Sequence, residues 1–388
     1  MVQSKLPNTN KSVFSSVQAL IEETAALDMA IGKTDFPCPA ELVDLASHYL
    51  KSGYHNYASL EGVLKLRNGI SDMVEGNYKH RYNPQTEVTV TAGTIQAIHT
   101  AISAVVRDDD EVIVFEPTFE SYVPSIILNG GKPVYLELKA PGFRIDWEEL
   151  RKMITTKTKM IIINSPNNPT GSVLSEADMQ QLQRLTNGTN IIILSDESFE
   201  SIVFDNVKHE SIARYPKLLD RAFIISSFGP VYNINGWGIS YCLAPEKLMA
   251  EFRKMQQFQV YNVNTPLQHA LADYLPKNHC FDEVSGMYQG KRNYFLRLLE
   301  NSLYNVIPSQ GSYFQLIDYS RVSDESDTVF VERMARDFGL AVLPMSAFYH
   351  EKSRARLFRI CFAKDNAKLE KAAELLLKIP STIVDDLS

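Results

Sequence analysis

Three polar side chains follow apolar, strand-like runs in the middle of this 388-residue chain. Asn168 comes after the run KMIIIN, Asp196 ends NIIILSD, and Ser227 ends RAFIISS. Ligands of open parallel sheets bind beyond the carboxyl ends of the strands, so we expect these side chains to meet at one site. For Asp196 alone, capping a following helix would be the commoner role. The order of the three residues at successive strand ends favours a site.

Two further features could bind anions. Arg359 lies within the apolar run LFRICFAK, where an arginine is costly to bury unless it is paired. Its guanidinium matches a carboxylate as a bidentate fork, and a structural ion pair is the alternative. Gly93, Thr94 and Ile95 lie between the run EVTV and a helical pattern, where backbone N–H groups could bind an anion. A simple tight turn is the alternative there.

Strands and helices that would position these residues alternate along the chain from about residue 87 onward. The runs EVTVTAG, EVIVFEP, KPVYLEL, KMIIINSP, NIIILSDES and RAFIISS predict strands, and TIQAIHTAISAVVR and SEADMQQLQRLTN predict helices between them. Alternating strands and helices predict an α/β fold with a mostly parallel, doubly wound sheet. The almost continuous apolar runs IIIN and IIILS are typical of strands that are buried on both faces.

The pattern changes after about residue 245. A long helical region covers residues 246–299, and SYFQLIDY and RLFRICFA predict strands beside the helices TVFVERMARDFG and AKLEKAAELLLK. We therefore expect a large domain at residues 40–275. Residues 1–39 and 276–388 would form an N-terminal arm and a smaller α+β domain.

Composition narrows the class of protein. Hydrophobic residues make up 45% and charged residues 22%, as in ordinary globular proteins, and the net charge of -7 argues against nucleic acid or an anionic membrane as partner. There is no long apolar run and no signal-peptide pattern. The four cysteines, Cys38, Cys242, Cys280 and Cys361, are widely spaced, and the eight histidines show no metal-ligand spacing. We expect a cytoplasmic protein with free thiols and no metal.

The segment SSFGPVYNINGWGISY, residues 226–241, resembles a segment of fold-type I aminotransferases. That segment reads Ser-Phe-Gly/Ser-Lys and then Gly-Trp-Lys/Arg-x-Gly-Tyr. SPNNPTG, residues 165–171, is similar to a specific mark of class I/II aminotransferases. The resemblance covers nearly the whole chain, and VTAGT and RICFAK bring it nearest to the branch with methionine and kynurenine aminotransferases. It implies aminotransferase fold type I, the cofactor pyridoxal phosphate (PLP), an amino- or keto-acid-like ligand, and a homodimer with shared sites.

The resemblance also assigns roles to residues. On the cofactor side, Asn168 would donate to the phenolic oxygen, Asp196 would hold the ring nitrogen, and Phe119 would stack on the ring. The remaining cofactor-binding positions would be Gly93, Thr94, Ile95, Ser227, Phe199 and Tyr57, the last reaching the phosphate of the neighbouring subunit. Arg359 and the Gly32 N–H would bind the substrate carboxylate beside Asn168. Lys33 would be a second cation there, or simply a solvated loop lysine.

Three positions depart from the family pattern on the cofactor side. Pro230 stands where the family has the lysine that holds PLP as a Schiff base, Phe199 replaces a tyrosine, and Gly238 replaces a lysine or arginine that meets the phosphate. A charge-assisted hydrogen bond contributes roughly 1.5–3 kcal/mol, so the loss at Gly238 should weaken cofactor binding by about tenfold or more. In the N-terminal loop, residues 30–34 (AIGKT) replace a pattern like Ser-Gln-Gly-Phe-Pro.

These features predict a protein that keeps a pocket for an α-amino or 2-oxo acid but no longer performs lysine-dependent transamination. PLP or pyridoxamine phosphate would bind without a covalent bond, if either binds at all. No residue is assigned a certain catalytic role. The first alternative is an inactive pseudoenzyme that acts as a binding or regulatory partner. The weaker alternative is residual transamination of a sulfur-containing or aromatic amino acid with PLP or pyridoxamine phosphate.

Overall fold

The computed structural model of the chain describes residues 3–7, 9, 11–277, 281–351 and 355–383. The helices are α1 (Val13–Thr24), α2 (Ala40–Lys51), α3 (Leu64–Tyr78), α4 (Thr94–Val105), α5 (Tyr122–Leu128), α6 (Trp147–Met153), α7 (Glu176–Thr186), α8 (Pro216–Leu219), α9 (Gly229–Tyr232), α10 (Glu246–Gln259), α11 (Thr265–Tyr274), α12 (Phe281–Leu298), α13 (Asp327–Phe338) and α14 (Asn366–Leu377). Short 3₁₀ helices are η1 (Ile212–Arg214), η2 (Asn235–Trp237), η3 (Leu275–Lys277) and η4 (Met345–Phe348). The strands are β1 (Leu27–Asp28), β2 (Val88–Thr91), β3 (Glu111–Glu116), β4 (Lys132–Glu137), β5 (Thr158–Asn164), β6 (Ile192–Asp196), β7 (Ala222–Ser227), β8 (Ser240–Leu243), β9 (Asn305–Ile307), β10 (Phe314–Asp318), β11 (Leu340–Ala341), β12 (Leu343–Pro344) and β13 (Leu357–Cys361).

A seven-stranded sheet carries the predicted strand ends. Its order is β2-β8-β7-β6-β5-β3-β4, and β8 is antiparallel to both of its neighbours while the other strands run parallel. The prediction of a mostly parallel α/β sheet is therefore confirmed. The register pairs Asn164 with Asp196 and Asp196 with Ile225, so the carboxyl ends of β5, β6 and β7 meet at one edge.

Several elements differ from the sequence-based expectation, among them the short strands β1, β9, β11 and β12, which no predicted run covers. Strand β8 was not predicted, because its four residues follow a glycine-containing turn and give too short a pattern. The helical region predicted for residues 246–299 is divided into α10, α11 and α12. The break before α11 has a local cause, since the Asn264 side chain accepts the Leu267 N–H at 3.1 Å as an N-cap and Pro266 lies in the first turn.

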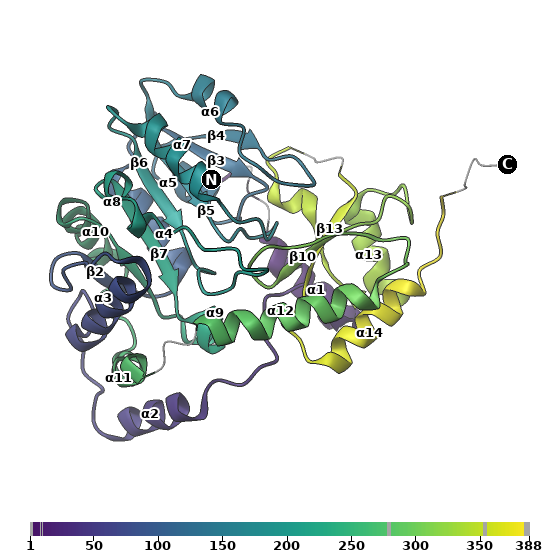
Figure 1. Cartoon of the computed structure of the whole chain (residues 1–388), viewed down its shortest axis with the longest axis horizontal. Coiled ribbons are helices and arrows are strands. Elements are labelled where there is room, and N and C mark those ends of the chain that lie inside the picture. Colours follow the sequence, from purple (N-terminus) through teal and green to yellow (C-terminus); the bar gives the residue numbers. More distant parts are fainter. Residues whose placement is uncertain (1–2, 8, 10, 278–280, 352–354, 384–388) are drawn as a thin grey trace.

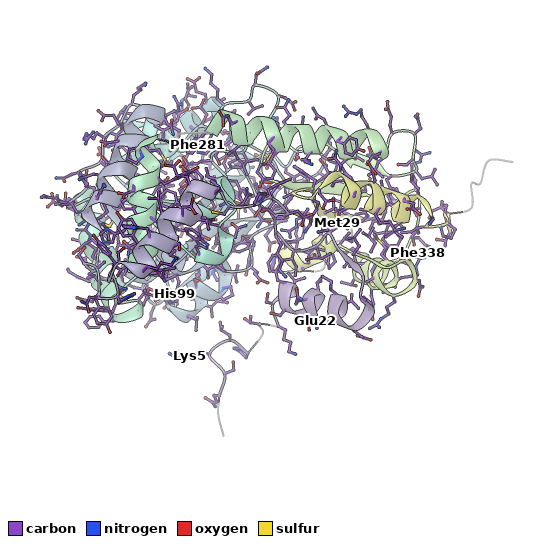
Figure 2. All side chains as sticks on the ribbon, turned by 90° about the horizontal axis from the view of Figure 1, so that it is seen from below. Lys5, Glu22, Met29, His99, Phe281 and Phe338 are labelled. Atoms are coloured by element: carbon purple, nitrogen blue, oxygen red, sulfur yellow. The ribbon has the colours of Figure 1, made fainter. Side chains whose placement is uncertain are left out.

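A second, four-stranded antiparallel sheet has the order β12-β13-β10-β9. Figure 1 shows it beside α13 and α14, on the other side of the molecule from the seven-stranded sheet, with α12 running between the two. Strand β1 of the N-terminal arm pairs with β11, and α1 packs on α13. Figure 2 shows Glu22, Met29 and Phe338 in this part, and Lys5 on a segment that projects away. The predicted domain limits at residues 39/40 and 275/276 stay a prediction.

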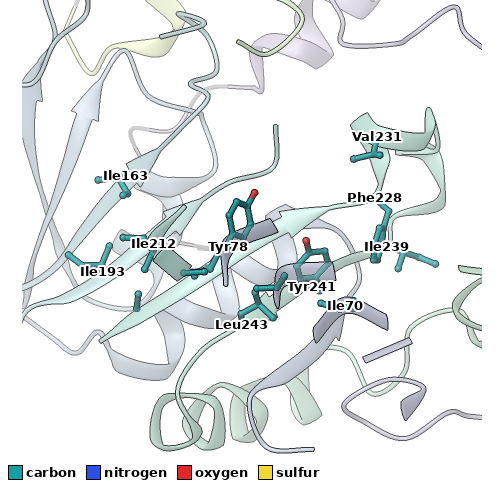
Figure 3. Close-up of a cluster of buried hydrophobic side chains, with 14 of the residues drawn as sticks. Ile70, Tyr78, Ile163, Ile193, Ile212, Phe228, Val231, Ile239, Tyr241 and Leu243 are labelled. Atoms are coloured by element: carbon teal, nitrogen blue, oxygen red, sulfur yellow. The ribbon is translucent and has the colours of Figure 1, made fainter. Parts of the chain in front are cut away.

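The core beneath the large sheet consists mainly of branched aliphatic side chains. Figure 3 shows part of it, with Ile163, Ile193 and Leu243 from three strands and Phe228 and Val231 around α9. Across the described segments, no helix is both long and apolar enough to cross a membrane. Cys38, Cys242 and Cys361 are free thiols, whereas Cys280 lies outside the described residues.

Candidate functional site

Asp196 is a buried carboxylate at the end of β6. Its Oδ2 accepts the Tyr122 hydroxyl at 2.6 Å, and its Oδ1 accepts the Ser198 N–H at 3.1 Å and the Ser198 hydroxyl. Burial raises the pKa of Asp196, although the bonds from Ser198 and Tyr122 act in the opposite direction. The chain after Asp196 forms a turn, so the helix-cap alternative is wrong.

Arg359 is a fully buried guanidinium in the middle of β13, with 0% of the residue exposed. Its Nη1 donates to Asn168 Oδ1 at 2.6 Å and its Nη2 to the Ala30 carbonyl at 2.8 Å, while Nε has no hydrogen-bond partner. Among the ion pairs of the described residues, none includes Arg359, so the alternative of a structural ion pair is not found. Burial lowers the pKa of Arg359 to about 10, which leaves the side chain charged at neutral pH.

A chain of amide contacts joins the two buried charges. Arg359 donates to the side chain of Asn168, whose backbone N–H donates to Asn164 Oδ1 at 2.8 Å. The Asn164 side chain then donates to the Asp196 carbonyl at 2.9 Å. Asn164, which the sequence analysis missed, thus links Asn168 and Arg359 to the backbone of Asp196. The described contacts of Ser227 are with Gly229 and Ser240, so the expected meeting of Asn168, Asp196 and Ser227 at one site stays a prediction.

The turn after β2 and the segment after β7 form another side of the site. Gly93 precedes α4 with φ +86°, and a Cβ on it would lie 3.9 Å from the Gly238 Cα. The first turn of α4, with partly buried Thr94 and exposed Ile95, therefore faces the backbone at Gly238. Gly238 itself has φ +62°, a left-handed conformation that suits glycine and would strain a lysine or arginine.

Pro230 is buried in α9, directly after β7. Before it, Ser227 Oγ accepts the Gly229 N–H at 3.1 Å and the Ser240 hydroxyl at 3.0 Å. Proline suits the first turn of a helix because the N–H groups there have no intrahelical partner. The local structure at residue 230 is thus well formed, but the residue offers no amine.

Aromatic rings connect the remaining predicted residues. Phe119 lies 6.3 Å from Phe14 and 5.9 Å from Tyr122, measured between ring centroids. Phe199 packs edge-on against Tyr313 at 5.0 Å, and the Tyr313 hydroxyl donates to the Gly32 carbonyl at 3.2 Å. Gly32 and Phe199 therefore lie together near Tyr313.

Two predicted residues lie apart from this group. The Lys33 side chain is exposed, and its carbonyl accepts the buried Lys364 ammonium at 2.9 Å. Tyr57 is 77% exposed and packs edge-on against Tyr261, which is 62% exposed. Tyr57 lines a surface cleft of about 560 Å³. The other lining residues are Gly53, Tyr54, Asn56, Ala58, Ser59, Val63, Leu64, Arg67, Thr265 and His269.

The sequence analysis missed Tyr122, Ser198 and Tyr313. Tyr122 follows Phe119 by three residues and Ser198 follows Asp196 by two, so proximity in the sequence was an available signal for both. Tyr313 had no such signal, because its contact with Gly32 spans 281 positions.

The site fits part of the cofactor that the resemblance implies. Asp196 retains acceptor capacity beyond its contacts with Tyr122 and Ser198, and the N–H groups at the start of α4 could meet a phosphate. Phe119 lies next to Tyr122, the partner of Asp196. Residue 230 cannot supply a covalent anchor. The residues present therefore fit the ring nitrogen and the phosphate of such a group, and Pro230 has no side-chain amine for a Schiff base.

A separate buried cluster carries metal-ligand side chains. Oxygen and nitrogen atoms of Glu197, Glu200 and His209 lie within 4.8 Å of one another. Each carboxylate oxygen already accepts a hydrogen bond from the protein; the donors are Ser195, His209, Ile212, Tyr78, Ser226 and Tyr241. The carboxylate oxygens are therefore occupied by protein donors, whereas His209 Nδ1 has no hydrogen-bond partner among the described residues, and we assign the cluster a structural role.

Comparisons with known proteins agree along nearly the full length. A family model described as aminotransferase class I and II matches residues 24–376. Methionine aminotransferase of Escherichia coli is 37% identical over 380 residues, covering 97% of this chain and 98% of that protein. Aromatic-amino-acid aminotransferase 2 of Thermococcus litoralis is 31% identical, covering 96% and 95%. The crystal structure of YbdL from Escherichia coli, described as having a methionine aminotransferase function, matches with a TM-score of 0.93 at 37% identity, covering 97% of this chain and 99% of that one.

Proposed function

The chain belongs to the aminotransferase class I and II family, and from this premise we propose that it binds a small α-amino or 2-oxo acid through Arg359. We also propose that it does not use a lysine at position 230 to transaminate that ligand. PLP or pyridoxamine phosphate would bind without a covalent bond, or not at all. The methionine and aromatic-amino-acid aminotransferases among its relatives suggest sulfur-containing and aromatic acids as the first ligands to test.

Arg359 is the observation that carries the proposal. A buried cation without a carboxylate partner is unfavourable, because its desolvation is only partly offset by neutral hydrogen bonds. Two carbonyl-type oxygens and the face of Phe314, whose centroid is 3.7 Å from the guanidinium carbon, stabilise Arg359 in the described contacts. A ligand carboxylate would add the missing charge through a bidentate contact.

Asp196 supports the binding of a positively charged group at the end of the site away from Arg359. Bound pyridine cofactors act as electron sinks when a carboxylate keeps the ring nitrogen protonated. Tyr122 and Ser198 hold the Asp196 carboxylate in place through three hydrogen bonds. Burial raises the pKa of Asp196, and a positively charged group beside it would favour its ionised form.

Other lysines near the site are poor replacements for the missing amine. The Lys364 ammonium donates to the Lys33 carbonyl, and the Lys33 side chain is exposed. Segment 226–241 contains no lysine. We therefore infer that any chemistry at this site proceeds without covalent attachment of the cofactor in that segment.

We further propose a homodimer in which Tyr57 completes the site of the second copy. The high exposure of Tyr57 and Tyr261, whose rings contact each other edge-on, supports this assembly. The division into a domain of residues 40–275 and a second unit of residues 1–39 and 276–388 is part of the same proposal.

A thermal-shift screen with methionine, phenylalanine and their 2-oxo acids tests the ligand proposal. We expect these acids to raise the Tm of the native protein, and we expect Arg359→Leu to remove the shift while the ligand-free protein stays folded. Arg359→Lys, which keeps the charge but loses the planar fork, should retain only a small part of the shift. Equal shifts in native protein and Arg359→Leu would contradict the proposal. Stabilisation without any turnover of the acid would favour the pseudoenzyme alternative.

A further inference from the structure

Three rings from three distant segments enclose the Arg359 guanidinium. The guanidinium carbon lies 3.7 Å from the ring centroid of Phe314, 5.4 Å from that of Phe348 and 5.5 Å from that of Phe14. Phe314 belongs to β10, beside β13 in the same sheet, whereas Phe348 lies in η4 and Phe14 in α1. Because Arg359 is 0% exposed, a carboxylate can reach it only if part of this enclosure moves.

The Glu120 carboxylate, which follows β3 of the seven-stranded sheet, binds the segment that carries Phe14. Ser12, the N-cap residue of α1, makes no side-chain bond to its own helix and instead donates its hydroxyl to Glu120 Oε1 at 2.5 Å. Glu120 Oε2 accepts the Val13 N–H at 3.2 Å. Glu120 thus takes the place of the missing cap, and its negative charge suits the N-terminus of a helix.

A second carboxylate, four residues earlier, holds the Phe348 segment. Buried Glu116 accepts the His350 N–H at 2.6 Å through Oε1 and contacts His350 Nδ1 at 2.7 Å through Oε2. The Thr118 N–H donates to the Phe348 carbonyl at 2.8 Å, and the His350 ring stacks on Tyr135 with centroids 3.9 Å apart. Residues 116–120 therefore bind both the segment that carries Phe14 and the segment that carries Phe348.

We propose that Glu116 and Glu120 form a two-point clasp that closes the Arg359 pocket and must release to admit a ligand. The proposal rests on Arg359 being the ligand-binding residue proposed above. In the closed state Glu120 tethers the first turn of α1 and Glu116 tethers η4. Release exposes the guanidinium without breaking the four-stranded sheet. Arg359 lies on β13 and Phe314 on β10, and these two strands stay paired.

Electrostatics couple the clasp to the pocket. Glu120 is close enough to Arg359 to favour the charged form of the guanidinium, so a ligand carboxylate would bring a second negative charge near Glu120. The other charged groups around the second contact are Glu351, whose carboxylate is 3.8 Å from His350 Nε2, and Glu137, which acts on Glu116. Both are acidic, so no further cation faces this contact among the charged groups named here.

Chemical labelling of the intact protein tests the clasp without any ligand. The probe is phenylglyoxal, which reacts with accessible guanidinium groups, and labelled arginines are identified by peptide mass spectrometry. The variants are Ser12→Ala and Glu120→Gln at one contact and His350→Phe at the other, the last keeping a ring to stack on Tyr135. If a substitution raises the equilibrium constant for opening by about tenfold, Arg359 should be labelled about tenfold faster in that variant.

Matched controls separate opening of the clasp from general loosening. Ser16→Ala removes a hydroxyl from the next turn of α1 whose one hydrogen bond among the described residues is to the Ser12 carbonyl, and it should leave Arg359 labelling unchanged. Arg292 is a buried internal reference held by Asp205 through both guanidinium NH2 nitrogens, and it should stay protected in every variant. Unchanged labelling of Arg359 in all three clasp variants would overturn the proposal.

Hydrogen exchange of the native protein provides a test that does not depend on the variants folding. The peptides that contain Val13 and His350 should exchange at similar rates, and faster than peptides of β6, because the clasp opens locally. Exchange as slow as that of β6 would overturn the clasp. If the clasp controls labelling but no amino or oxo acid stabilises the protein, the proposed function fails and the clasp stands.

Discussion

Asp196 and Arg359 are the two residues whose environment says most about the ligand. Each is buried, and neither takes part in an ion pair within the described part of the chain. Asn168 and Asn164 connect them through amide contacts, which transmit position but do not neutralise charge. This arrangement favours the binding of two opposite charges, a cationic group beside Asp196 and a carboxylate beside Arg359.

Glu200 provides a pH-dependent prediction at the same scale. Its carboxylate accepts the hydroxyls of Tyr78, Tyr241 and Ser226, and Figure 3 shows the two tyrosine hydroxyls pointing to the same side. Burial raises the pKa of Glu200, and the charge on Glu197 adds to the effect. The folded state therefore holds this proton more tightly than the unfolded state, so the stabilising contribution is present at low pH and is lost as pH rises through the folded pKa.

We expect Glu200→Gln to flatten this dependence. Urea unfolding of the native protein should show a free energy of unfolding that falls more steeply than that of the variant as pH rises above the ordinary glutamate pKa and through the raised pKa of Glu200. Glu210→Gln is the control, because that partly exposed carboxylate accepts only the Tyr215 hydroxyl among the described contacts. Parallel curves for native protein and Glu200→Gln would show that Glu200 does not change its proton occupancy on folding.

At the scale of elements, the short helix α9 explains how the fold accommodates Pro230. The residue lies in the first turn after β7, where a proline removes no intrahelical hydrogen bond. The Ser240 hydroxyl donates to the Ser227 hydroxyl and links the end of β7 to β8. The Asn235 side chain donates to the Gly32 carbonyl at 3.4 Å. The element is well formed around Pro230, so we propose that a proline at this position affects chemistry rather than folding.

Restoring an amine on α9 tests this view. After incubation with PLP and reduction by borohydride, Pro230→Lys should carry the reduced cofactor on residue 230, because β7 and Asp196 still position the site. The native protein should carry no adduct in segment 226–241, which has no lysine. Asn233→Lys puts an amine on the partly exposed residue after α9 and should trap much less cofactor. Equal trapping by the two variants would mean that position 230 does not face a cofactor site.

At the scale of the whole molecule, the exposed aromatic side chains point to a second copy of the chain. Tyr57, Tyr261 and Phe258 lie on the surface with most of their area exposed. Isolated exposed apolar side chains are ordinary, but Tyr57 and Tyr261 contact each other edge-on at 5.2 Å. The cleft that Tyr57 lines would be covered in a dimer.

Sedimentation analysis over a range of concentrations checks the dimer. The native protein should sediment as a dimer, and Tyr261→Asp should raise the dimer dissociation constant by about tenfold or more, since a buried interface tolerates an unpaired charge poorly. Val329→Asp, at an exposed apolar position on α13, is the matched control and should leave assembly unchanged. A native protein that stays monomeric at every concentration would exclude a site shared between copies.

Local patterns in the sequence were sufficient for strands β2 to β7, for helices α4 and α7, and for singling out Asn168, Asp196 and Arg359, because periodicity and strand-end polarity are encoded within a few residues. They also established that segment 226–241 has no amine to offer. Only the tertiary structure decided which side chains meet Arg359 and what closes over it. The contacts of Glu120 with Ser12 and of Glu116 with His350 span 108 and 234 positions, and no local pattern carries information over such separations. Packing of the start of α1 and the end of η4 against residues 116–120 makes those contacts. Within the described residues, the fold also leaves the buried Arg359 guanidinium without a carboxylate in hydrogen-bond contact.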